Sequence, residues 1–176
     1  MAELLFSVLV KENKTEFLEK VKKIASNLCI NPDWLMAVMK KESGMRATAT
    51  NFITGATGLI QFMPRTAVGL GTTCAELKAM SNVYQLNFVE KYYKPYAGRI
   101  NSFVDLYLVT FFPAALGKQD DWIMQTPYLP ASLVAQQNSG VDLNKDRQIT
   151  VGEFKTYCYK GFTSVQVDIL KKKVRV

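Results

Sequence analysis

The chain has 176 residues, of which 48% are hydrophobic and 21% are charged. A chain of this length can bury a sizeable core, and this composition is that of an ordinary globular protein, which excludes extensive disorder. The formal charge of +7 attracts polyanions, but no nucleic-acid-binding module and no apolar run long enough to cross a bilayer accompany it. We therefore expect neither nucleic-acid binding nor stable membrane insertion.

Two further features of the composition limit the chemistry. The sequence has no histidine, and its three cysteines (Cys29, Cys74 and Cys158) lie at unrelated spacings, which argues against histidine-based catalysis and against a zinc site. The apolar run at residues 4–10 is short and has no basic segment before it, so we expect no signal peptide and synthesis in the cytoplasm. We expect one domain over residues 1–176 and a monomer.

Helical signals dominate the chain and predict a mainly α fold. Apolar residues at helical period predict a helix over residues 15–28, and Asn31, Pro32 and Gly44 fit the N-cap, first position and left-handed C-cap of the next. Residues 48–54 predict an irregular loop or small hairpin. Further helices are expected over residues 73–80, from 81 or 82 to Pro95, over 102–112, and near 151–160 and 164–173, with a loop framed by Pro127 and Pro130.

Glu42 is the first candidate for chemistry. In the helix after Asn31, it continues the apolar face formed by Leu35, Val38 and Met39, because these residues fall at i, i+3, i+4 and i+7. A half-buried carboxyl near the negative end of a helix dipole favours its protonated form, which a general acid needs. The alternative is that Glu42 simply ends a surface helix.

A glycine-rich stretch follows Glu42 at a short distance. Gly55 and Gly58 permit tight turns, and Gln61 carries an amide into an apolar wall that includes Met63. The two motifs, Glu-Ser-Gly at residues 42–44 and Gly-Ala-Thr-Gly-Leu-Ile-Gln-Phe-Met-Pro-Arg-Thr-Ala at residues 55–67, resemble the lytic transglycosylase and goose-type lysozyme superfamily. Phage-encoded members are especially similar, as in an endolysin, and the resemblance covers residues 31–71 well.

The resemblance implies a lysozyme-like fold, formally α+β, and an enzyme that cleaves the glycan strands of peptidoglycan. The enzyme would act on the bacterial cell wall, either in the periplasm or after delivery in a phage virion. The resemblance also implies that Glu42 is the catalytic acid and that Ser43, Gln61 and Met63 contact Glu42 or substrate. The Ala-Tyr-Asn motif of the family is absent in its usual form, and Tyr107 is its substitute here. No cofactor is implied for catalysis.

The spacing of carboxylates bears on the fate of the sugar. After Glu42, no Asp or Glu occurs before Glu76, so the predicted turn has no base that could activate water. The 6-hydroxyl of N-acetylmuramic acid is then the expected acceptor, which gives 1,6-anhydro products. Asp105, Asp120 or Asp121 could instead support hydrolysis, so a lysozyme is the alternative. The second alternative is a non-catalytic structural module that binds the cell wall or calcium.

Residues 142–153 have the spacing of an EF-hand calcium loop. Oxygen-bearing side chains fall at positions one, three, five, nine and twelve, and the carbonyl of Gln148 falls at seven; the predicted ligands are Asp142, Asn144, Asp146, Gln148 and Glu153. Arg147 occupies the position that favours glycine, where a positive φ costs about 1 kcal/mol. We predict a structural Ca²⁺ site, and an Asx-rich turn is the alternative.

Overall fold

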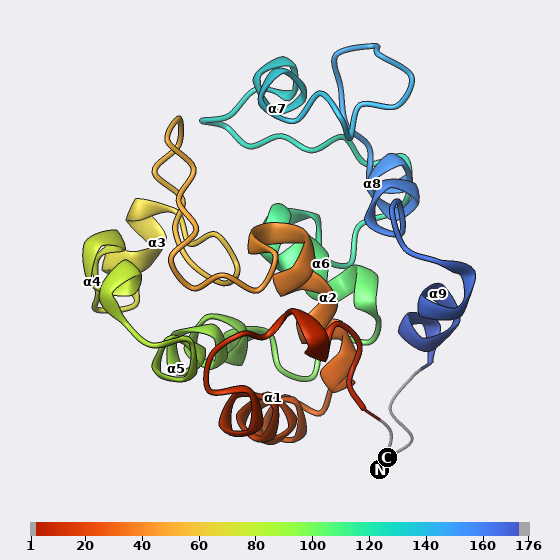
Figure 1. The fold of residues 1–176 in the computed structure, drawn as a ribbon. Coiled ribbons are helices and arrows are strands. Elements are labelled where there is room, and N and C mark those ends of the chain that lie inside the picture. Colours follow the sequence, from red (N-terminus) through yellow and green to blue (C-terminus); the bar gives the residue numbers. More distant parts are fainter. Residues whose placement is uncertain (1–2, 173–176) are drawn as a thin grey trace. The chain divides into compact units, whose positions relative to one another are not determined.

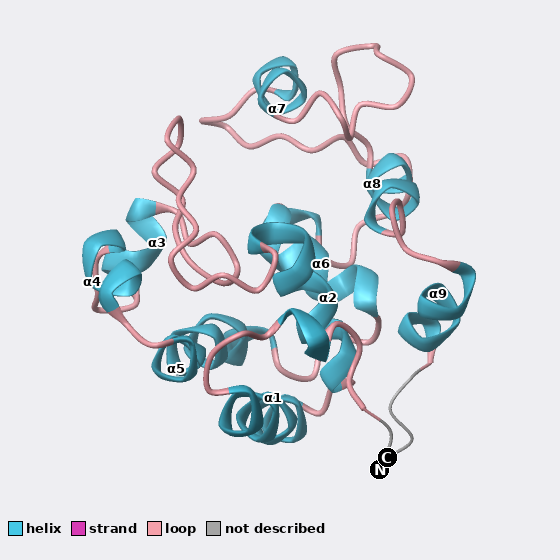
Figure 2. Cartoon of the chain, in the orientation of Figure 1, coloured by secondary structure: helices cyan, strands magenta, loops and turns pink. Residues whose placement is uncertain are grey.

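The computed structural model describes residues 3–172, and this part of the chain is mainly helical (Figures 1 and 2). Its elements, in chain order, are η1 (Ser7–Leu9), α1 (Lys14–Leu28), α2 (Pro32–Ser43), α3 (Pro64–Gly69), α4 (Cys74–Ala79), α5 (Asn82–Tyr93), η2 (Lys94–Tyr96), α6 (Phe103–Phe111), η3 (Pro113–Ala115), α7 (Ala131–Gln137), α8 (Val151–Cys158) and α9 (Ser164–Lys171). Within residues 3–172, β structure is limited to isolated bridges. None of the helices there is long and apolar enough to cross a bilayer.

The described chain forms two compact units. Unit 1 comprises residues 3–101 together with Lys172, and unit 2 comprises residues 102–171. Unit 1 contains η1, η2 and helices α1 to α5, and unit 2 contains η3 and helices α6 to α9. The expectation of a single domain over residues 1–176 stays a prediction.

Helix α2 occupies the core of unit 1. Its residues from Trp34 to Met39 are all buried, so this segment is covered on every side. Helix α1 packs against both α2 and α5. It does so through one apolar face (Phe17, Val21, Ile24 and Leu28), while its charged residues face solvent, as the helical period of the sequence requires. Burial of this face fixes α2 between its neighbours.

A looped segment connects α2 to α3. Antiparallel bridges join Thr57 to Thr50 and to Phe62, which gives a small hairpin followed by a tight turn. The loop or hairpin predicted at residues 48–54 is therefore confirmed. Asn51 shapes its tip, where its Oδ1 accepts hydrogen bonds from the backbone N–H groups of Ile53 and Thr54 at 2.9 and 3.1 Å.

Unit 2 is organised around an aromatic core. Helix α6 packs against α8 and η3. The ring of Tyr107 on α6 lies 6.0 Å from that of Phe103 and 5.2 Å from that of Phe154 on α8, measured between centroids. Ile149 and Met124 of the same unit are also fully buried, and Met124 N–H donates to Ile149 O at 2.8 Å.

Most helix boundaries agree with the sequence signals because those signals are local. Asn31 Oδ1 accepts from Asp33 N–H, Pro32 opens α2, and Gly44 closes it at a φ of 61°. The capping box expected at Thr73 and Glu76 has both of its hydrogen bonds. The last helix ends at Lys171, and position 173 of its predicted range lies outside the described residues.

Two short helices differ from the sequence predictions. Helix α3 begins at Pro64, directly after the glycine-rich turn, and helix α7 follows Pro130, where the sequence indicated only a loop. Both have a proline at or just before the first turn, where the ring's fixed φ suits a helix start. Each is too short to show a helical period, so the sequence pattern does not predict it.

Candidate active site around Glu42

Glu42 lies in the last turn of α2. Its side chain is half-buried, whereas Leu35, Val38 and Met39 of the same face are fully buried, so the face opens towards solvent at Glu42. Gly44 ends the helix and turns the chain away from its axis. The structure therefore places Glu42 where an apolar helix face meets the surface, as the spacing predicts.

Ser43 connects α2 to the glycine-rich turn. The residue is buried, and its Oγ lies 3.0 Å from Met39 O and 2.9 Å from Leu59 O. A hydroxyl has one proton, so it donates to one of these carbonyls at a time. In this structure Ser43 thus attaches the residue beside Glu42 to the turn, and its role towards Glu42 or a sugar oxygen stays a prediction.

The turn itself depends on two unusual backbone conformations. Gly58 has a φ of 90° and Gln61 a φ of 53°, which is uncommon for a residue with a Cβ. The side-chain amide of Gln61 compensates, because its Nε2 donates to Gly58 O at 3.1 Å and to Ala49 O at 3.2 Å. Its Oε1 accepts no hydrogen bond from residues 3–172 and remains an acceptor for another group.

An aromatic side chain from α5 completes this region. The ring of Tyr92 is half-buried and meets Phe62 edge to face, with centroids 6.1 Å apart. Burial raises the pKa of Tyr92, and repulsion from Tyr96 and from the charge of Glu42 raises it further. The electrostatic coupling places Tyr92 near Glu42, a proximity that the sequence could not indicate because 50 positions separate the two residues.

Two other predicted contacts have different surroundings. Met63 is 47% exposed at the start of α3, where it is accessible to a ligand. Tyr107 is only 3% exposed and belongs to the aromatic core of unit 2. Its role as a substrate contact stays a prediction.

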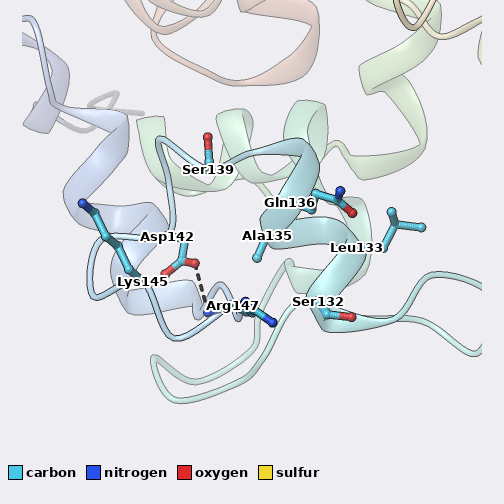
Figure 3. A pocket seen from close by; sticks show the side chains of 8 residues that line it. All are labelled: Ser132, Leu133, Ala135, Gln136, Ser139, Asp142, Lys145 and Arg147. Carbon is cyan, nitrogen blue, oxygen red and sulfur yellow. Dashed lines mark hydrogen bonds between the residues drawn. The ribbon is translucent and has the colours of Figure 1, made fainter.

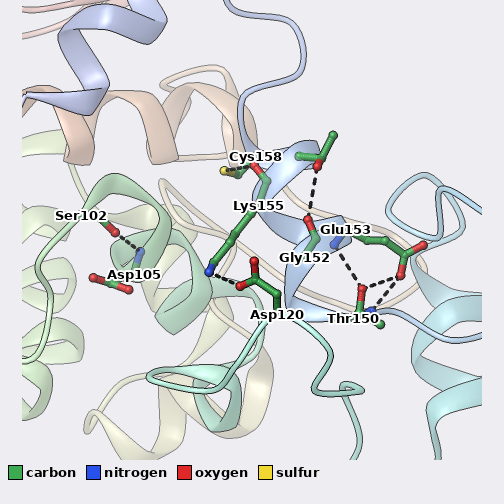
Figure 4. Close-up of polar contacts among 9 residues, drawn as sticks. Ser102, Asp105, Asp120, Thr150, Gly152, Glu153, Lys155 and Cys158 are labelled. Carbon is green, nitrogen blue, oxygen red and sulfur yellow. Dashed lines mark hydrogen bonds and ion pairs between the residues drawn. The ribbon is translucent and has the colours of Figure 1, made fainter.

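The loop over residues 142–153 forms a compact turn before α8. Glu153 Oε2 accepts from Thr150 N–H and Oγ1, both at 2.9 Å (Figure 4). Its Oε1 accepts from the N–H groups of Leu143 and Asn144. Burial alone would raise the pKa of Glu153, but these hydrogen bonds outweigh it and lower the pKa. Nearby, Lys155 forms an ion pair with Asp120.

Asp142 is the exception within this loop. Its Oδ2 accepts from Arg147 N–H at 3.1 Å, but its Oδ1 is buried and has no hydrogen-bond partner among residues 3–172. Arg147 has a φ of 67°, the conformation expected at the glycine position of a calcium loop. Residues 3–172 contain no group of three or more His, Cys, Asp or Glu side chains that is already gathered for a metal ion.

A surface pocket of about 750 Å³ lies beside this loop in unit 2 (Figure 3). It is lined by residues of α7 and of the loop, including Ser132, Gln136, Lys145 and Arg147. Glu42 and the glycine-rich turn do not line it. The volume of this pocket is therefore not evidence about the chemistry of Glu42.

Comparison with known proteins bears on unit 1. Residues 19–90 match the family model described as Transglycosylase SLT domain. The match includes Glu42, the turn and most of α5, but it covers less than half of the chain. It supports a lytic transglycosylase-like family and, in general terms, cleavage of glycosidic bonds in peptidoglycan. No curated protein and no solved structure gives a significant match.

Proposed function

We propose that the chain is a peptidoglycan lytic transglycosylase in which Glu42 is the general acid and base. The observation that carries the proposal is the position of Glu42: a half-buried carboxyl at the end of a buried helix, near Tyr92 and attached through Ser43 to the Gly58–Gln61 turn. Partial burial disfavours the charged form of a carboxyl, which is the direction that a general acid needs. The match to the SLT family supports the same assignment.

The proposed reaction requires one carboxyl and no water. Glu42 donates its proton to the glycosidic oxygen between N-acetylmuramic acid and N-acetylglucosamine, and the bond from that oxygen to muramic C1 breaks. The Glu42 carboxylate then takes the proton of the muramic 6-hydroxyl, and O6 bonds to C1. The products are a 1,6-anhydromuramic end and a free 4-hydroxyl, and Glu42 is protonated again.

The surroundings of Glu76 and Asp120, two of the other carboxylates, favour this route over hydrolysis. Glu76, the next carboxylate along the chain, is used in the capping box of α4, where hydrogen bonds from Thr72 and Thr73 lower its pKa. In unit 2, Asp120 is paired with Lys155. With these groups engaged, an intramolecular hydroxyl with a high effective molarity is the better acceptor.

The test compares Glu42→Gln with Glu76→Gln on purified peptidoglycan. We expect Glu42→Gln to retain its fold and its binding to peptidoglycan but to lose at least about 100-fold in turnover, the scale typical of a lost general acid. Glu76→Gln removes a carboxylate of the same unit and should retain turnover. Near-normal activity in folded Glu42→Gln would end the proposal.

We further propose that residues 142–153 hold a structural Ca²⁺. The supporting observation is the buried Asp142 Oδ1, since an unpaired buried carboxylate oxygen is costly and a hard cation with oxygen ligands would satisfy it. Asn144, Asp146, Glu153 and the carbonyl of Gln148 would supply the other oxygens. The residues fit Ca²⁺ in their chemistry, although Glu153 and Asp146 now accept hydrogen bonds from the loop's own amides.

Asp142→Asn tests this proposal directly. Asparagine keeps an oxygen that can accept from Arg147 N–H but removes the charge, so it should abolish a Ca²⁺-dependent rise in melting temperature without unfolding the loop. Glu153 is less suitable for substitution because it also caps α8. If the unsubstituted protein has the same melting curve with and without millimolar Ca²⁺, the Ca²⁺ site is refuted and the loop is an Asx-rich turn.

A further inference from the structure

We propose that Gln85 of α5 is a positioning residue for the active site. The inference rests on the function proposed for Glu42. Gln85 is fully buried, and its side chain makes three hydrogen bonds to the backbone of other segments. Its Oε1 accepts from Leu59 N–H at 2.6 Å, and its Nε2 donates to Ala47 O at 3.0 Å and to Leu77 O at 2.8 Å.

These contacts hold the turn from α5, while Ser43 holds it from the end of α2. The N–H of Leu59 is bound by Gln85, and the C=O of the same residue is bound by Ser43, the neighbour of Glu42. Residue 59 is therefore fixed between α5 and the end of α2. Ala47, which Gln85 also binds, lies shortly after Glu42 in the loop that connects α2 to α3. Leu59 lies near the other end of this loop, so Gln85 joins its two ends.

The fit between Gln85 and the turn is close. A Cβ at position 58 would lie 2.5 Å from Gln85 Oε1 and 2.9 Å from its Cδ, so only glycine allows the backbone to approach this amide. The φ of 90° at Gly58 makes the same demand. A substitution that displaces or shortens the side chain of Gln85 would release the turn that carries Gln61.

Gln85 and Tyr92 lie on one face of α5, because they are seven positions apart in one helix. One fixes the turn, and the other packs on Phe62 and lies near Glu42. We infer that this face of α5 sets the distance between Glu42 and the turn. Displacement of a reacting group by about 1 Å can reduce turnover about 100-fold, so the loss of this support should appear in kcat.

The experiment uses two isosteric substitutions on the same helix. Gln85→Met removes the amide that holds the turn. Asn82→Leu removes another buried amide, whose Nδ2 donates to Glu12 O at 2.7 Å. Its hydrogen bonds go to Glu12, Asn13 and Val83, and none goes to the turn. Both variants lose buried hydrogen bonds and should lose stability. Turnover and KM on soluble peptidoglycan fragments are measured below both melting temperatures.

We expect Gln85→Met to lower kcat at least about 10-fold with a smaller change in KM, and Asn82→Leu to keep kcat. If Gln85→Met does not fold, Gln85→Asn retains a polar amide that is too short to reach all three partners, and the same loss is expected. Equal kcat values in a folded Gln85 variant and Asn82→Leu would overturn the inference. Turnover by Glu42→Gln would instead overturn the proposed function, so the two failures are distinguishable.

Discussion

Replacement of Ser43 by alanine tests how α2 is joined to the turn. The change removes the hydroxyl that lies 2.9 Å from Leu59 O and 3.0 Å from Met39 O. Met39 O keeps the backbone N–H groups of Gly44 and Met45 as donors, so Leu59 O is the carbonyl that loses its partner. An unsatisfied buried acceptor costs about 1 to 3 kcal/mol, and we expect about 1 to 2 kcal/mol here, because a carbonyl keeps some freedom to relax.

Urea unfolding followed by circular dichroism measures this loss. The free energy of unfolding should fall by about 1 to 2 kcal/mol at an unchanged m-value. Turnover should fall too, because Leu59 is then held only from the side of α5. Ser7→Ala is the control, since Ser7 is also buried but its Oγ donates to Glu3, outside the site. Unchanged stability with lost turnover would refute the reasoning and assign the hydroxyl to the substrate.

Three other substitutions test the account. Arg147→Gly should raise the melting temperature by relieving a φ of 67°, worth about 1 kcal/mol, and thermal denaturation measures it. Burial opposes the hydrogen bonds to Glu153, but the hydrogen bonds dominate and lower its pKa. The stability that Glu153 contributes is therefore present above its ordinary pKa of 4.5 and is lost as the pH falls through the lowered value. Glu153→Gln should reduce the free energy of unfolding at pH 7 and weaken its decrease at acid pH, as measured by urea titrations. Burial raises the pKa of Asp33, although the hydrogen bond from Leu5 N–H opposes this shift. The contribution of Asp33 to stability is therefore complete below its ordinary pKa of 3.8 and is lost as the pH rises through the raised value. Asp33→Asn should stabilise the protein at pH 7 but not at pH 3 in urea titrations, and no gain in stability at pH 7 would contradict this.

Local signals account for what the sequence predicted well. Asn31, Pro32 and Gly44 define the ends of α2 through their own backbone preferences, and the face that carries Glu42 follows from helical spacing. The positive φ of Arg147 was likewise expected from its position in the loop. Such features involve residues that are near one another in the chain, so no knowledge of tertiary packing is needed.

The remainder of the site depends on packing between distant segments. Gln85 and Tyr92 reach the turn and Glu42 only because α5 packs inside unit 1, and no local rule specifies that contact. A signal was present in the sequence, since Gln85, Val89 and Tyr92 fall at i, i+4 and i+7, and an amide on an apolar helix face is unusual. The buried position of Ser43 is also not evident from the sequence, because its partner Leu59 lies 16 residues away.

The most direct test of the central claim is digestion of purified peptidoglycan in ¹⁸O-labelled water, followed by mass analysis of the muramic ends. Transfer to the 6-hydroxyl uses no water, so the account predicts 1,6-anhydromuramic ends without heavy oxygen, and no such products with Glu42→Gln. Substantial incorporation of ¹⁸O at muramic C1 would show hydrolysis and would contradict the transglycosylase assignment.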